Sequence, residues 1–142
     1  MGLARVGFVV HPGAMEVLAV SECLELLAGE EVGRLGVIVS GRPEIFPVNY
    51  VVDGNGILFR TAEGTKLDAA TRGAVVFEVD HLDRDTRSGW SVIVHGHAAV
   101  YTHFDSAAMR RASSLWWDTP KAHLVRITPD VIGGRRLRHA PP

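Results

Sequence analysis

The sequence predicts a mainly β domain with short helices (α+β), in which roughly six strands form a small closed or partly closed barrel. Several short runs rich in β-branched residues are separated by turn signals. The helical segments are too few and too short for a doubly wound α/β fold. The 142 residues, 46% hydrophobic and 22% charged, have the balance of one ordinary globular domain.

Bulk composition excludes several classes of protein. A formal net charge of -1 argues against a nucleic-acid partner. The single cysteine, Cys23, excludes a disulfide framework and a multi-cysteine zinc site, and we interpret it as a buried helical thiol. No apolar run is long enough to span a membrane, and the first residues lack the pattern of a signal peptide. We therefore expect a cytoplasmic protein without a membrane partner.

The chain divides into an N-terminal arm, residues 1–14, and a single domain, residues 15–142. "HPGAM" interrupts the apolar start, so the arm is a flexible segment, an alternative start or a strand that packs on a partner. "SECLELLAG" then predicts a short helix with Ser21 as its N-cap, acidic Glu22 and Glu25 in the first turn, and Gly29 at its end.

Three strands are expected next. "VGRLGVIVSG" is the first, and a turn at Ser40, Gly41 and Arg42 leads into the second, "PEIFPVNYVVD". Pro47 cannot donate a ladder hydrogen bond, so this strand has an edge or a bulge there. "DGNG" is a strong hairpin signal, and it leads into the third strand, "ILFRT".

The second half alternates helices and strands. A short helix over about Thr65 to Arg72 ends at Gly73 and precedes the strand "AVVFEVD". "HLDRDTRSG" reads as a polar loop, and "WSVIVHGHAAVYTH" as a long strand with a bulge or bend at Gly96. Asp105 is suited to cap a helix that runs to about Ser114. After the irregular segment "LWWDTPK", "AHLVRITPDVIGGRRL" is the last strand.

The segment "FRTAEGTKLDAA" combines features that suit a phosphate. Arg60 and Lys66 supply cations, Thr61 and Thr65 supply hydroxyl groups, and the helix N-terminus supplies backbone N–H groups. Gly64 permits close approach of the backbone. The same residues also fit a solvated loop with two surface charges and a capped helix. The residues alone leave these two interpretations equally open.

A family resemblance favours the phosphate site. Six motifs follow one another along the chain, and they are "ECLELL", "VGRLGVIV", "GRPEIFPVNYVVDGNGILFRTAEGTKLDAA", "AVVFEVD", "GWSVIVHGHA" and "KAHLVRITPDVIGGRRL". In this order they resemble the pyridoxamine 5'-phosphate oxidase-like, FMN-binding split-barrel family over roughly Met15 to Leu137. The resemblance implies a split β-barrel of the FMN-binding type and the phosphate of FMN as the ligand of this corner. The implied phosphate ligands are Arg60, Thr61, Thr65 and Lys66.

The resemblance also implies the rest of the cofactor site. Pro47, Val48 and Asn49 would lie along the isoalloxazine ring of FMN, and Trp90 and Ser91 would reach it from the other subunit. The expected assembly is a homodimer with cofactor sites at the subunit interface, open to a small-molecule substrate.

The function implied is that of a flavin-binding oxidoreductase of unknown substrate, without an identifiable catalytic residue. Alternatives are a reductase that uses coenzyme F-420 on the same fold, and a non-catalytic flavin carrier or redox sensor. We do not expect authentic pyridoxamine phosphate oxidase activity, because no pocket for the substrate's own phosphate can be placed in the chain.

Four other side chains are assigned less specific roles. His95 and His97 would share one face of a strand, but no third ligand accompanies them, so no metal site is predicted and haem is only a remote option. Glu78 and Asp80 interrupt an otherwise apolar strand, and we interpret them as outward-facing rather than catalytic.

Overall fold

A computed structural model describes residues 15–62, 64–101 and 123–139. These residues form seven strands and two helices, with neither helix long and apolar enough to cross a membrane. In chain order, the elements are β1 (Met15–Leu18), α1 (Val20–Ala28), β2 (Val32–Val39), β3 (Arg42–Asp53), β4 (Gly56–Thr61), α2 (Thr65–Arg72), β5 (Ala74–Asp83), β6 (Ser88–Val100) and β7 (His123–Leu137).

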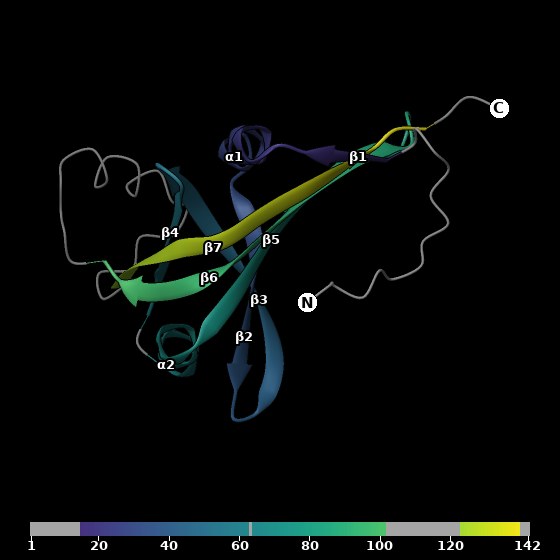
Figure 1. The fold of residues 1–142 in the computed structure, drawn as a ribbon. Helices are drawn as coiled ribbons and strands as arrows, with labels where there is room; N and C mark the ends of the chain where they lie inside the picture. The colour runs from purple at the N-terminus through teal and green to yellow at the C-terminus, as the bar shows by residue number, and fades with distance from the viewer. Residues whose placement is uncertain (1–14, 63, 102–122, 140–142) are drawn as a thin grey trace.

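Six of the strands close into an antiparallel barrel. The order is β7, β4, β3, β2, β5 and β6, and pairing of β6 with β7 completes the circuit. The short strand β1, which the sequence did not predict, pairs with the end of β7 (Figure 1). The predicted mainly β barrel is therefore confirmed, with one additional strand outside the circuit.

Strand β7 explains why the barrel is split. One of its sides pairs with β6 along almost its whole length. Its other side pairs with β4 through residues 123–127 and with β1 through residues 134–137. Between these two segments, residues 128–133 pair only with β6 among the described strands. The barrel wall is therefore interrupted at the middle of β7.

Aromatic side chains fill the centre of the barrel. Tyr50 and Phe77 pack edge to face, with ring centroids 4.9 Å apart. The Tyr50 hydroxyl donates a hydrogen bond to the Leu27 carbonyl oxygen, and this bond ties α1 to the barrel. Cys23 on α1 is buried, as the sequence predicted, and its burial raises the pKa of the thiol.

Two local predictions were wrong. Helix α1 begins at Val20 with Ala19 as its N-cap and no side-chain capping bond, so Ser21 lies inside the helix. "HLDRDTRSG" is mostly strand, because β5 continues to Asp83 and β6 begins at Ser88. In this polar hairpin β5 pairs with β6, and β6 pairs with β7. The hairpin extends beyond the core, so no apolar alternation in the sequence predicts it. The helix expected from Asp105 and the segment "LWWDTPK" lie outside the described residues.

Two other local predictions were confirmed. Pro47 lies opposite Arg34 of β2, and residues 42–49 of β3 pair with no other described strand, so this stretch is an edge. Between β6 and β7 the register shifts at Gly96. His95 faces Val131, whereas Gly96 faces Pro129, which leaves Asp130 as the extra residue of a bulge in β7.

The bulge leads to a prediction about stability. A Cβ atom at Gly96 would lie 2.3 Å from the Thr128 carbonyl oxygen, which belongs to the backbone of β7. We expect Gly96→Ala to lower the free energy of unfolding by about 1–3 kcal/mol, as overpacking does. Urea denaturation followed by circular dichroism measures this loss. The exposed Gly73, where an added Cβ meets nothing within 4 Å, is the control site for the same substitution.

Candidate cofactor site

The predicted corner lies where β4 ends and α2 begins. Gly64 is the N-cap of α2 with a φ of 142°, a backbone conformation that favours glycine. Its carbonyl oxygen accepts the bond from the Asp68 N–H at 3.0 Å, but glycine has no side chain to accept from the first N–H groups of the helix. This N-terminus is therefore suited to an external anion.

Arg60 and Thr61 are neighbours on β4, so their side chains point to opposite faces of the strand. Thr61 faces the core with 6% exposure, and its hydroxyl donates to the Ala62 carbonyl oxygen at 3.3 Å. Arg60 is half-buried and lies opposite Leu124 of β7, on the face that also carries Leu58. The structure does not bring these two side chains to one side of the strand.

Lys66 joins α2 to β3. Its ammonium lies over the Phe46 ring, 5.6 Å from the centroid, in a cation–π contact. The side chain is half-buried, and this desolvation lowers the pKa of the ammonium. Phe46 immediately precedes Pro47 on β3, so the contact brings the predicted phosphate corner next to the strand predicted to line the flavin. Sequence reasoning missed Phe46, because nothing local to its position indicates the contact.

The three predicted residues on β3 alternate in direction. Val48 is buried in the core, whereas Pro47 is exposed and Asn49 is half-buried on the other face. Only one of these two faces can meet a planar ligand through side chains. The three residues together can line it only by their backbone edge, and the edge position of β3 at Pro47 leaves one side of that backbone without a neighbouring described strand.

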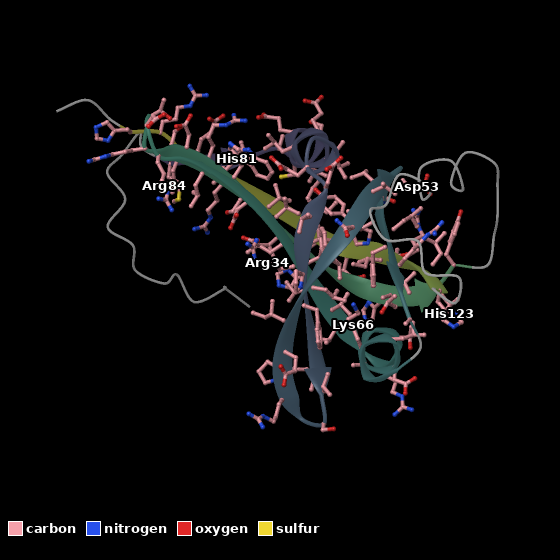
Figure 2. All side chains as sticks on the ribbon, turned by 180° about the vertical axis from the view of Figure 1, so that it is seen from behind. Arg34, Asp53, Lys66, His81, Arg84 and His123 are labelled. Atoms are coloured by element: carbon pink, nitrogen blue, oxygen red, sulfur yellow. The ribbon has the colours of Figure 1, made fainter. Side chains whose placement is uncertain are left out.

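Trp90 and Ser91 lie near the start of β6, away from the strand residues that neighbour the C-terminal end of α2. Trp90 packs half-buried against the core between His81 of β5 and Arg136 of β7. The strand neighbour of Ala74, which follows the C-terminal end of α2, is His97. Seven residues of strand separate Trp90 from His97, which corresponds to about 23 Å. Figure 2 shows Lys66 at α2 and His81, the β5 partner of Trp90, in different parts of the molecule.

The remaining candidates form no metal site. His95 and His97 are exposed on β6, and His97 Nδ1 lies 2.9 Å from Asp130 Oδ2. Across the part of the chain that the structure describes, no three metal-ligating side chains come together. Glu78 and Asp80 lie on the side of β5 that faces away from the core, beside Arg34.

The chain is similar to proteins of known structure and to curated proteins. It is 41% identical to the FAD binding protein from Mycobacterium smegmatis, with a TM-score of 0.73, over 87% of this chain and 100% of that one. A FAD-binding protein from Mesorhizobium loti shares the fold, with a TM-score of 0.75, 22% identity and coverage of 88% and 98%. An uncharacterized protein of Mycobacterium tuberculosis is 31% identical over 82% of this chain and 81% of its own length.

A family model provides the assignment. The model described as pyridoxamine 5'-phosphate oxidase matches residues 19–136, from the start of α1 to the end of β7. This range contains the whole barrel and the corner at α2. The chain therefore belongs to the pyridoxamine 5'-phosphate oxidase family.

Proposed function

We propose that this protein is a flavin-dependent oxidoreductase of unknown substrate that binds FMN as a homodimer. The observation that carries the proposal is the corner itself, where a Gly64-capped helix N-terminus stands beside Lys66 and follows Arg60. The 41% identical protein from Mycobacterium smegmatis is described as an FAD binding protein, which supports a flavin as the ligand.

The residues at the corner fit a phosphate. Lys66 and Arg60 offer two cations to a dianion, and the first N–H groups of α2 offer donors at the positive end of the helix dipole. Thr61 and Thr65 complete the proposed set, and Thr61 would have to give up its bond to the Ala62 carbonyl oxygen to donate to the phosphate. Because Lys66 is already partly desolvated over Phe46, its charge gains from an anionic neighbour.

The cofactor, once bound, would supply the redox chemistry, and the chain would supply its placement. Backbone groups of Pro47, Val48 and Asn49 would lie along the ring. N–H groups near the pyrimidine edge of the ring would stabilise the negative charge that develops there on reduction. No described side chain is assigned a proton-transfer role.

The proposed homodimer would bring Trp90 and Ser91 of β6 to the flavin of the partner subunit. Two copies related by a two-fold axis would exchange these residues reciprocally. Each of the two sites would then consist of one subunit's corner and the other subunit's β6, with the open face of the flavin available to a small-molecule substrate.

Three alternatives concern the cofactor and its use. FAD carries the same riboflavin 5'-phosphate, and the similarity to the FAD binding protein from Mycobacterium smegmatis favours it as the second candidate. We favour FMN because two cations at one corner suit its doubly charged terminal phosphate, whereas FAD distributes two negative charges over two phosphates. The second alternative is coenzyme F-420 bound on the same fold. The third is a protein that carries flavin or senses redox state without turnover.

Identification of the bound cofactor is the test of this proposal. We expect the purified protein, or the protein mixed with FMN, to show the visible absorption of a flavin, and the extracted compound to have the mass of FMN. If the extracted compound had the mass of FAD or of F-420, that cofactor would take the place of FMN in the proposal. Failure to bind any of the three would refute the proposal. Turnover with a reduced nicotinamide and an electron acceptor separates an enzyme from a carrier.

A further inference from the structure

Phe46 connects the strand of the proposed ring site to the phosphate corner. Helix α2 packs mainly on β2 and β6. The side-chain contact that joins it to β3 is that of Lys66 with the Phe46 ring, where the ammonium lies 5.6 Å from the ring centroid. The corner therefore has a partner on β3 that lies outside its own segment of the chain.

The barrel fixes the position of the Phe46 ring. Phe46 lies opposite Leu35 of β2, so it points to the same side of the sheet as this fully buried residue. The ring is itself half-buried and packs against the main core. The next side chain on this side of β3, Val48, is buried. The ring is therefore a fixed platform at the border of the core.

The charge of Lys66 is suited to an anion from outside the chain. Lys66 takes part in none of the ion pairs between described residues. Its side chain is half-buried, and this desolvation lowers the pKa of the ammonium. The ring meets the ammonium from one side, so N–H donors on the other side remain available to phosphate oxygens.

The contact also orders the lysine side chain. A lysine has many rotamers, and ordering it when a ligand binds costs affinity. Here the ammonium is held above the Phe46 ring in the folded protein. The ordering then takes place on folding rather than on binding, which is the advantage of a preorganised site.

We propose that Phe46 is a positioning residue that sets the preference of this protein for FMN over riboflavin, by holding Lys66 where the phosphate binds. The inference rests on the proposed function, because it takes the corner at α2 as the phosphate site. Phe46 acts only through Lys66. Riboflavin lacks the phosphate, so its affinity should not depend on Phe46.

The experiment measures the dissociation constants of FMN and of riboflavin for the cofactor-free protein by fluorescence titration. Phe46→Leu keeps an apolar side chain but removes the ring. We expect it to bind FMN about three- to tenfold more weakly, the cost of ordering one long side chain, and to bind riboflavin as the wild type does. Phe46→Tyr keeps the face of the ring and is expected to keep both affinities. Phe46→Met replaces Phe46→Leu if the latter does not fold.

Val39→Ala is the control for a general loss of packing. Val39 of β2 is half-buried and packs against the same core as Phe46, but it offers no aromatic face to a cation. We expect this variant to lose stability without a change in the ratio of the two dissociation constants. A changed ratio in Phe46→Leu alone then reports on the phosphate and not on the fold.

A double-mutant cycle tests whether Phe46 acts through Lys66. Lys66→Met keeps an unbranched chain and removes the charge. In this background we expect Phe46→Leu to cause no further loss of FMN affinity. Equal losses in the two backgrounds would overturn the proposal, because Phe46 would then act independently of the lysine.

Other results also decide the matter. Unchanged FMN affinity in Phe46→Leu would exclude a positioning role, and an equal loss for FMN and riboflavin would mean that Phe46 supports the isoalloxazine ring instead. A gain in FMN affinity would show that the cation–π contact competes with the phosphate. A wild-type protein that binds neither compound, or binds FMN no better than riboflavin, would refute the proposed phosphate site itself.

Discussion

The Arg60→Ala, Lys66→Ala double variant is expected to bind FMN at least 100-fold more weakly than the wild-type protein. Each change removes a charge-assisted contact to phosphate, worth about 1.5–3 kcal/mol, and the N–H groups of α2 retain only part of the affinity. Fluorescence titration of FMN into the cofactor-free protein measures the loss. The proposed isoalloxazine contacts along β3 would be left in place, so riboflavin, which lacks the phosphate, should bind both proteins equally.

Arg72→Ala is the matched control for this experiment. Arg72 lies in the last turn of the same helix, exposed and at the end opposite the phosphate corner. Its removal changes the net charge of α2 by the same amount as Lys66→Ala but leaves the corner intact. Equal loss of affinity in both variants would indicate a general electrostatic effect, and undiminished affinity in the double variant would place the phosphate elsewhere.

Phe77→Ala is expected to produce the largest loss of stability. The ring is 0% exposed and packs edge to face on Tyr50 at the centre of the barrel. Substitutions of this kind cost about 3–5 kcal/mol, through lost burial and the cavity left behind. The shift of the urea denaturation midpoint at unchanged slope measures it. A loss below about 1 kcal/mol would mean that the core collapses around the vacancy.

Gly33 provides an internal check on that packing. A Cβ atom there would lie 2.4 Å from Phe77 Cζ, so Gly33→Ala alone should destabilise the protein by overpacking. In the Phe77→Ala background the ring is gone and the added methyl group enters the cavity. The double-mutant cycle should therefore show a favourable coupling free energy, and strict additivity of the two losses would contradict this arrangement.

Much of the barrel could be predicted because its determinants are local. "DGNG" marks the turn between β3 and β4, Gly73 marks the end of α2, and runs of β-branched residues mark the strands. The exceptions are elements that are stabilised by pairing with other strands rather than by a local sequence pattern. Strand β1 has four residues and exists by pairing with β7 more than a hundred positions later. The polar ends of β5 and β6 extend beyond the core, so no apolar alternation marks them.

The candidate site was predictable in its composition and not in its geometry. The residues of the corner lie within one segment, so the sequence shows which cations and hydroxyl groups are available. That Arg60 and Thr61 point to opposite faces follows from strand alternation once β4 is known to include both. The contact of Lys66 with Phe46 depends on how α2 lies against β3, which no local pattern encodes.

The long strand β7 has a consequence for how the protein is made. It supplies the neighbour of β6, of β4 and of β1, yet it spans residues 123–137 and is therefore synthesised after all of them. On the ribosome, β4 and β6 present open edges until β7 emerges, and open edges recruit other strands. Closure also depends on contacts of high sequence separation, which slow folding. Chaperone protection during synthesis should therefore matter most for nascent chains that have not yet reached β7.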